Sequence, residues 1–213
     1  MKHMIRGRNV GIVYRRQMPE GETPTYFFIS NDIISDGYIK SDNKGSETIA
    51  PLYLYHDDGE RTSNLRAERV RDLAINLGRR PSDEDVFDYI YGVFHSNVYR
   101  SKFKELLKDD FPRVPVPADD EEFESFRGAG EELRGLHLMV DPAVDDFVTS
   151  YPRAGDHVVR AIRRVDDQVW INDTQYFGGV SDDVWNFIIG AYKPAQKWLE
   201  QRKGRALTGD EID

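Results

Sequence analysis

The chain has 213 residues, of which 39% are hydrophobic and 12% aromatic, a composition that supports a globular protein with a sizeable core. It contains no cysteine, which excludes disulfides, thiolate metal sites and cysteine nucleophiles and suits a reducing cytoplasm. No segment approaches the ~18 consecutive apolar residues of a membrane-spanning helix, and the charged N-terminal segment does not resemble a secretory signal. We therefore expect a cytoplasmic protein that has no membrane partner.

The formal net charge is −9, which opposes binding to nucleic acid, but the charge is distributed unevenly. Residues 61–80 carry six arginines and two carboxylates, a local charge of +4. Residues 81–132 carry fourteen carboxylates and six basic residues, a local charge of −8, whereas residues 193–205 return to +4. Because most of the acidity lies in one block, the folded chain can still present a basic face.

Strand-forming residues dominate the N-terminal part of the chain. Residues 9–16 and 25–30 are β-branched and aromatic, and the segment between them, which contains proline and glycine, predicts a loop. A third, weaker strand is predicted at residues 33–39. An edge strand is predicted at residues 49–55, because Pro51 cannot donate a hydrogen bond to a neighbouring strand.

Helical periodicity follows over about residues 63–139. Ser63 or Asn64 is expected to cap a first helix that ends before Gly78, and Ser82 to cap a second helix.

Two further helices are predicted in the same part of the chain. The first runs over residues 98–108, before the helix-breaking Pro112. The second spans residues 119–139 with a break near Gly128, because each glycine in a helix costs about 1 kcal/mol relative to alanine.

The pattern returns to strands in the C-terminal third. Residues 157–177 are predicted to form a β-hairpin that turns at Asp166-Asp167. A hairpin of this kind with arginines on one side can enter the major groove of DNA.

A pair of helices is predicted to close the chain. Ser181 is expected to cap the first helix, in which Phe187 and Ile188 pack against the core. Pro194 suits the first turn of the second helix, which Gly204 terminates. The predicted fold class is α+β, with N-terminal antiparallel strands, a helical middle (about 63–139), a β-hairpin at 157–177 and a C-terminal helix pair at 181–203.

This layout predicts a single domain over residues 1–213, and it also permits two lobes. In the two-lobe arrangement, residues 1–60 and 151–213 form a strand-rich lobe and residues 61–150 form a helical lobe.

Catalytic motifs are absent from the sequence. It has no phosphate-binding G-x-x-x-x-G-K-[ST], no nucleophile motif G-x-S-x-G and no zinc-binding H-E-x-x-H. The five histidines lack ligand spacing, and His56-Asp57-Asp58 is typical of a solvated loop. We therefore expect no catalytic residue, no metal and no cofactor in this chain. A stand-alone hydrolase that uses Asp and His groups is kept as an alternative hypothesis.

Side chains able to read DNA bases form one set of candidates. Arginine pairs with guanine and the amides of Gln and Asn pair with adenine at the edges of the bases. The candidates are Arg160, Arg163, Arg164, Asn172, Thr174, Gln175, Arg16 and Gln17. The alternative is an ordinary hairpin that has a polar outer face.

Side chains able to hold DNA phosphates form a second set. Phosphate contacts position a protein on the duplex but carry no sequence information. The candidates are Arg61, Arg66, Arg69, Lys193, Lys197, Arg202, Lys203 and Arg205. The alternative is a solvated surface on which these cations pair with neighbouring carboxylates.

Spaced blocks of sequence extend over nearly the whole chain. They include NVGIV at 9–13, PLYLY at 51–55, DVFDYIYGVFHS at 85–96, TQYF at 174–177 and KPAQKW at 193–198. In their order and spacing these blocks resemble the C-terminal specificity domain of the type ISP restriction-modification enzymes.

The resemblance implies a DNA target-recognition domain. In such single-chain enzymes the domain follows an N6-adenine methyltransferase domain, which flips the target adenine out of double-stranded DNA and methylates it with S-adenosylmethionine. The sequence lacks the methyltransferase Asn-Pro-Pro-Tyr loop, helicase motifs and a nuclease signature. The resemblance therefore implies a non-catalytic piece of a larger protein whose other domains bind S-adenosylmethionine, Mg and ATP. An interaction module that docks other domains without contacting bases is the alternative.

Overall fold

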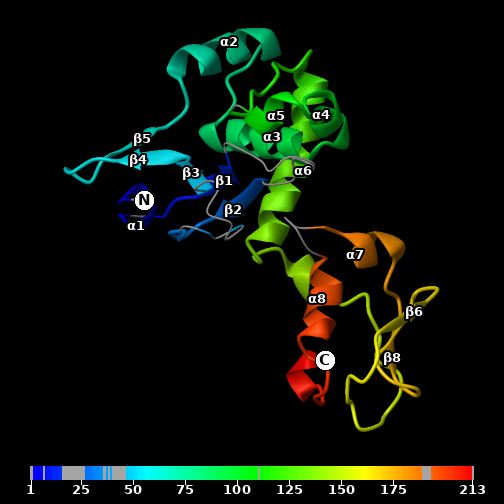
Figure 1. The fold of residues 1–213 in the computed structure, drawn as a ribbon. Helices are drawn as coiled ribbons and strands as arrows, with labels where there is room; N and C mark the ends of the chain where they lie inside the picture. The colour runs from blue at the N-terminus through cyan, green and yellow to red at the C-terminus, as the bar shows by residue number, and fades with distance from the viewer. Residues whose placement is uncertain are drawn as a thin grey trace. The chain divides into compact units, whose positions relative to one another are not determined.

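The computed structural model describes most of the chain, namely residues 2–6, 8–15, 27–35, 37, 39, 47–109, 111–188 and 193–212. The chain divides into two compact units, Met1–Val144 and Asp145–Asp213 (Figure 1). Helices and antiparallel strands occur together, which confirms the α+β fold class. The division differs from the expected lobes, because the N-terminal strands belong to the same unit as the helical middle.

A three-stranded antiparallel sheet of order β2-β1-β3 opens the first unit. Its strands are β1 (Gly11–Arg15), β2 (Phe27–Ser30) and β3 (Glu47–Pro51). Ile12 and Ile29 lie opposite each other and are buried, so one face of the sheet contributes to the core. Pro51 ends the edge strand, in agreement with its missing donor. The strand predicted at 33–39 does not form among the residues described there.

The strand predicted at 49–55 is broken in two. Leu52, which is buried in the core, separates β3 from β4 and lets the chain change direction. β4 (Tyr53–Tyr55) pairs with β5 (Arg61–Ser63), a strand that was not predicted, so Arg61 lies on a strand. A short helix, α1 (Lys2–Ile5), precedes all of these strands in the chain.

Helices make up the rest of the first unit. They are α2 (Ala67–Leu77), α3 (Asp83–His95), α4 (Asn97–Lys102), α5 (Leu106–Asp109) and α6 (Asp120–His137). The N-cap of α2 is Arg66 and not Ser63 or Asn64, because β5 extends to Ser63 and delays the start of the helix. Gly78 ends α2 at a φ of 68°, as predicted, and Ser82 caps α3 in a capping box with Asp85. The helix predicted over 98–108 is split by a turn into α4 and α5.

The contact between α3 and α6 organises the core of the first unit. A Cβ atom built on Gly130 would lie 1.8 Å from the carbonyl oxygen of Asp88, and one on Gly92 would lie 2.1 Å from that of Phe126. The two backbones therefore touch. Arg134 of α6 also donates to both carboxylate oxygens of buried Asp88, at 2.6 and 2.9 Å. These contacts explain why α6 is continuous and why the break predicted near Gly128 is wrong.

The second unit is built on a small antiparallel sheet of order β6-β7-β8, with two short helices after it. Its elements are β6 (Arg163–Val165), β7 (Gln168–Trp170), β8 (Tyr176–Phe177), α7 (Asp182–Asn186) and α8 (Pro194–Glu200), with a 3-10 turn at Gly209–Glu211. A further 3-10 turn, Pro142–Asp145, lies at the boundary between the two units in the sequence. The predicted hairpin is thus replaced by three shorter strands. Its turn at Asp166-Asp167 is confirmed, and Asp166 adopts a φ of 54°.

The C-terminal helices are shorter than predicted. α7 is capped by Ser181 but ends at Asn186, so Phe187 and Ile188 lie beyond it and are 56% and 49% exposed. The prediction that these two side chains pack against the core is therefore wrong. Pro194 begins α8 as predicted, and Gly204 follows the helix at a φ of 88°.

Replacing Gly130 with alanine is expected to lower the free energy of unfolding by about 2 kcal/mol, because the added methyl group would meet a backbone carbonyl of α3. Gly128→Ala is the matched control in the same helix. A Cβ there meets nothing within 4 Å, so this change is expected to stabilise α6 by up to about 1 kcal/mol. Urea denaturation measures both effects, and equal effects would contradict the close contact.

Candidate nucleic-acid interface

Two amides that were predicted to read bases lie inside the second unit. Gln175 is 0% exposed and Asn172 is 7% exposed. Asn172 Oδ1 accepts from the backbone amides of Thr174 and Gln175 at 2.9 and 2.8 Å, and from the Thr174 hydroxyl at 3.1 Å. Asn172 Nδ2 donates to the carbonyl of Val158 at 3.1 Å and to Gln175 Oε1 at 3.0 Å. The hydrogen-bonding groups of Asn172 are therefore used within the fold.

The side chain of Gln175 connects three parts of the second unit. Its Oε1 also accepts from the backbone amide of His157 at 2.9 Å, and its Nε2 donates to the carbonyl of Arg153 at 3.0 Å. Gly155 passes so close that a Cβ atom there would lie 2.5 Å from this amide. We name these contacts, together with those of Asn172, the amide network. It fixes the loop at 153–157 against the sheet.

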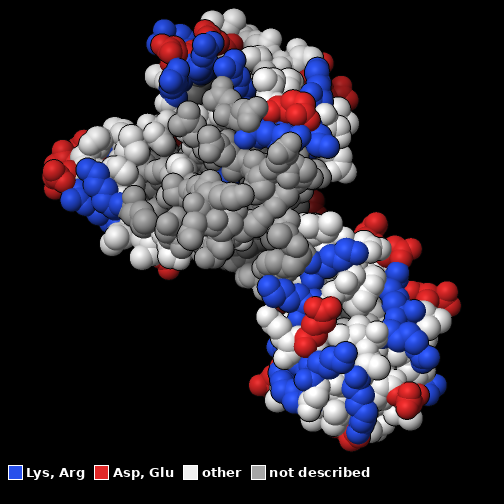
Figure 2. Space-filling view, viewed as in Figure 1, with Lys and Arg blue, Asp and Glu red and all other residues white. Residues whose placement is uncertain are grey.

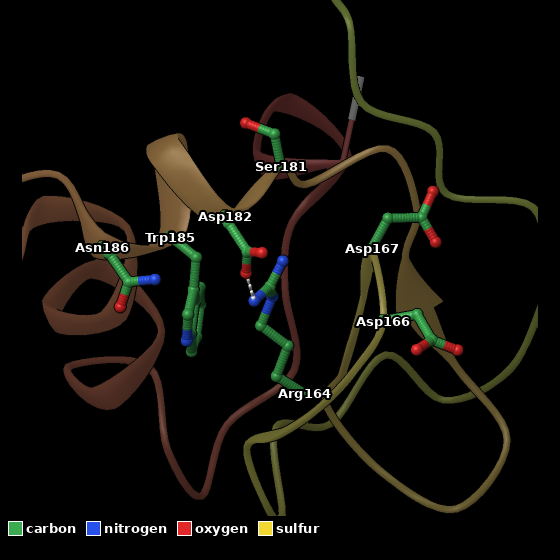
Figure 3. A pocket seen from close by; sticks show the side chains of 7 residues that line it. All are labelled: Arg164, Asp166, Asp167, Ser181, Asp182, Trp185 and Asn186. Carbon is green, nitrogen blue, oxygen red and sulfur yellow. Dashed lines mark hydrogen bonds and ion pairs between the residues drawn. The ribbon is translucent and has the colours of Figure 1, made fainter.

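Arg160 and Arg164 are occupied by carboxylates. Arg160 donates to Asp156 and holds the pKa of that carboxyl down to about 2. Arg164 donates to Asp182 and, at 3.1 Å, to the carbonyl of Val180. In Figure 3 the Arg164 guanidinium points at Asp182 in an open pocket, beside the ring of Trp185.

The lining of this pocket disfavours a phosphate. Asp166, Asp167 and Asp182 line it together with Arg164, so carboxylates outnumber the single cation (Figure 3). Like charges repel, and the arginine is already neutralised by Asp182.

The face of the β6-β7-β8 sheet opposite the Arg164 side chain carries aromatic side chains and an arginine. Arg163 lies directly across from Trp170, which lies across from Tyr176, so the three form one row over all three strands. The alternation of side chains places Val165 and Gln168 on the same side. We call this surface the outer face; its residues are Arg163, Val165, Gln168, Trp170 and Tyr176. Their side chains are exposed or half-exposed.

Two guanidinium groups stack on the aromatic rings of the outer face. Arg163 Cζ lies 5.6 Å from the centroid of the Trp170 ring. Arg153 Cζ lies 5.6 Å from the same centroid and 5.5 Å from that of Tyr176. Neither arginine pairs with a carboxylate within the described residues. Sequence reasoning missed Arg153, Gln168, Trp170 and Tyr176; alternation along β7 could have found Gln168 and Trp170.

The basic residues of the C-terminal segment differ in their surroundings. Arg205 donates two hydrogen bonds to the Glu211 carboxylate, at 2.8 and 2.6 Å, and Arg202 donates one at 2.8 Å. These contacts hold the pKa of Glu211 below its usual range. Lys193 donates to the side chain of Asn186 at 2.8 Å. Lys203 is exposed and forms no ion pair with any carboxylate that the structure describes. Lys197 is exposed as well.

The predicted phosphate-binding residues of the first unit lie on β5 and α2. Arg61 Cζ lies 4.1 Å from the centroid of the Tyr53 ring, and Arg69 Nη1 lies 3.8 Å from Asp72 Oδ2. Arg66 is exposed and has no carboxylate partner within the described ranges, as is also true of Arg71 and Arg80 nearby. Figure 2 shows basic side chains gathered over the α2 end of this unit, with acidic side chains among them. Arg16 and Gln17 lie outside the described residues.

A cluster of rings in the first unit contains buried Tyr91, half-buried His95 and exposed His137. The Tyr91 hydroxyl lies 2.6 Å from His137 Nδ1, and Arg100 lies 3.1 Å from His95 Nδ1. Burial, the Arg100 charge and His137 together lower the pKa of His95 to about 3. Among the described residues no three His, Cys, Asp or Glu side chains are placed to hold a metal ion, and no helix is long and apolar enough to cross a membrane.

Fold and surface together define an α+β protein of two units, and each unit by itself carries exposed cations that have no carboxylate partner among the described residues. The family model described as the Type ISP C-terminal specificity domain matches residues 1–212. The chain therefore belongs to the family of Type ISP C-terminal specificity domains. Comparison with curated proteins finds no match.

Three solved structures share this fold. The cryo-EM structure of a DrdV–DNA complex matches with a TM-score of 0.67 and 21% identity over 92% of this chain and 20% of that one. The ATP-dependent Type ISP restriction-modification enzyme LlaBIII bound to DNA matches with a TM-score of 0.65 and 21% identity, over 97% of this chain and 14% of that one. A nuclease-deletion mutant of the Type ISP restriction-modification enzyme LlaGI in complex with a DNA substrate mimic matches with a TM-score of 0.60 and 19% identity, over 97% of this chain and 15% of that one. The chain thus spans a fifth or less of each of these proteins.

Replacing Asn172 with alanine is expected to lower the free energy of unfolding by about 2 kcal/mol, because the backbone amide of Gln175 would stay buried without its acceptor. Asp173→Ala, at an exposed neighbouring position, is the control and is expected to change stability by less than about 0.5 kcal/mol. Chemical denaturation distinguishes the two. A mild effect at Asn172 would contradict its internal role.

Acid is expected to destabilise the first unit through His95. Its pKa is about 3 in the folded chain, against an ordinary value of 6.5, so only the unfolded chain binds the proton between these values. The contribution to stability is complete above about pH 6.5 and is lost as the pH falls toward 3. Denaturation over this range should show a shallower pH dependence for His95→Gln than for the wild type. His56→Gln, at an exposed position in the same unit, is the control substitution.

Proposed function

We propose that the chain recognises a specific sequence in double-stranded DNA, as the target-recognition domain of a restriction-modification enzyme. The single observation that carries this proposal is the match of the Type ISP specificity-domain model to residues 1–212. The fold supports it, because the three similar structures are described as DNA complexes or as a complex with a DNA substrate mimic.

The charges of the chain are compatible with this function in spite of the net −9. Many of the carboxylates are engaged by arginines within the fold, as Asp120 and Glu124 are by Arg79. Arg66 and Lys203, in contrast, are exposed without a carboxylate partner among the described residues. Such free cations can replace the counterions of DNA phosphates, which is the main source of affinity for the duplex.

The proposal includes an enzymatic partner domain. The similar proteins are several times longer than the chain, since the matched part covers 14–20% of their length. In our proposal an adjacent N6-adenine methyltransferase domain binds S-adenosylmethionine and modifies the site that this chain selects. Mg and ATP would bind to further nuclease and translocase domains, and this chain would contribute specificity and no catalytic group.

A second candidate role, docking of another domain, has its own support in the second unit. Phe147, Val148 and Phe187 are 73%, 79% and 56% exposed. A contiguous patch of exposed apolar side chains can mark a protein interface. This role is compatible with DNA recognition, because it uses different residues from the outer face and the free cations.

Binding of the chain to duplex DNA should weaken steeply as salt concentration rises. Arg66→Ala and Lys203→Ala are each expected to reduce affinity for all sequences and to flatten the plot of log K against log salt by about 0.9 for each DNA phosphate that the variant no longer neutralises. Fluorescence anisotropy with labelled duplexes measures both quantities.

The matched controls are Arg79→Ala and Arg205→Ala. Each removes the same charge from the same unit as its counterpart, but from an arginine that carboxylates already neutralise. They should leave the salt dependence near that of the wild type. The proposal fails if the wild-type chain shows no salt-dependent binding to any duplex.

A further inference from the structure

We propose that the outer face of the β6-β7-β8 sheet is the surface that reads base edges in the major groove, with Arg163, Arg153 and Gln168 as the reading side chains. This inference rests on the proposed function and specifies where in the second unit the DNA sequence is read.

Ion pairing separates the arginines of the second unit into two classes. The unit contains six, and four of them donate to carboxylates, namely Arg160, Arg164, Arg202 and Arg205. Arg153 and Arg163 have no such partner among the described residues, and both lie at the outer face. An arginine reads guanine by donating two N–H groups of its guanidinium at once. Of the six, these two arginines keep them available without breaking an ion pair to a described carboxylate.

The aromatic row prepares the two guanidinium groups for this task. Trp170 and Tyr176 lie 4.7 Å apart between ring centroids, and the arginines stack on them at 5.5–5.6 Å. Stacking occupies the flat side of a guanidinium and leaves its edge, where the N–H groups are, free to donate. It also restricts the long side chain before DNA arrives, which reduces the entropy lost on binding.

Gln168 supplies the complementary chemistry on the same face. It lies on the same strand as Trp170, its side chain is half-exposed, and its amide forms no hydrogen bond within the described part of the chain. A glutamine amide can both donate to and accept from adenine. Val165, directly opposite on β6 and 46% exposed, offers an apolar contact of the kind that suits a thymine methyl group.

The buried amide network positions this face from behind. Gln175 holds the carbonyl of Arg153 at 3.0 Å and the amide of His157 at 2.9 Å, which fixes the loop that carries Arg153. The next residue, Tyr176, places its ring under the Arg153 guanidinium. Gln175 is therefore a positioning residue, although its type would also suit base reading.

The occupant that fits this face is the major groove of duplex DNA. A small antiparallel sheet can enter that groove, and proteins that read DNA through β-strands do so with side chains of one face. Two unpaired cations favour a polyanion, whereas the half-exposed amide and the apolar side chain would add nothing to a purely electrostatic phosphate contact.

Selection of bound sequences from a randomised duplex library tests the inference with the whole 213-residue chain. The wild type is expected to enrich one motif. Arg163→Ala and Gln168→Ala should each lose the preference at one or two positions and bind the wild-type motif roughly 10- to 100-fold more weakly. Arg160→Ala, which removes the same charge from an arginine paired with Asp156, is the control and should select the wild-type motif.

Arg163→Lys guards against a variant that fails only because its fold is damaged. It keeps the charge but replaces the rigid planar fork of the guanidinium with a single rotatable ammonium group, so it should still bind DNA but with a weaker preference at that position. Circular dichroism and gel filtration of each variant report folding and association state.

The possible results separate this inference from the proposed function. If the wild type enriches no sequence, the proposed function fails and the inference with it. If Arg163→Ala, Arg153→Ala and Gln168→Ala all select the wild-type motif, the inference is overturned while DNA recognition stands. It is also overturned if the variants weaken binding equally for all sequences, or change only the association state, because the face would then hold phosphates or a second protein.

Discussion

The organisation of the second unit depends on one buried side-chain amide. Gln175 has no exposed surface, and its two polar atoms bond to groups contributed by Asn172, His157 and Arg153. The strands of this unit are only two or three residues long, too short to define a rigid sheet by their own ladders. Hydrogen bonds of a buried amide, which would be costly to leave unmade, supply the missing constraint.

The first unit relies on a constraint of another kind. Gly92 and Gly130 let the backbones of α3 and α6 touch, and half-buried Arg134 of α6 also donates to buried Asp88 of α3. Close backbone packing thus constrains the first unit, while buried polar contacts and a hydrophobic cluster around Val159, Val169 and Ile171 constrain the second. The first provides a scaffold for exposed basic side chains on α2, while the second presents the row of arginines and aromatic rings on the outer face.

Local signals in the sequence predicted the ends of several elements well. Ser82 and Gly78 act within one turn of their own helices, so neighbouring residues suffice to identify them. The continuity of α6 was not predictable in this way, because the glycines that weaken the helix are compensated by a contact with α3.

The candidate site shows the same limit more clearly. Gln175 and Arg163 both have the chemistry of a base reader, yet one lies in the core and the other on the outer face. A shift of one position along a strand moves every side chain to the other side of the sheet. The first strand of the predicted hairpin was longer than β6, so the prediction did not fix which side chains share a face. Whether an arginine is free or neutralised depends on partners such as Glu211, which no periodicity reveals.

The separation between support and surface in the second unit has an evolutionary consequence. Positions such as Arg163 and Gln168 contribute to the outer face without taking part in the amide network beneath it. Under the proposed mode of base reading, substituting these residues changes what the outer face can recognise but leaves the amide network intact. A domain built in this way can acquire a new target through a few surface substitutions, while the chain that carries them continues to fold as before.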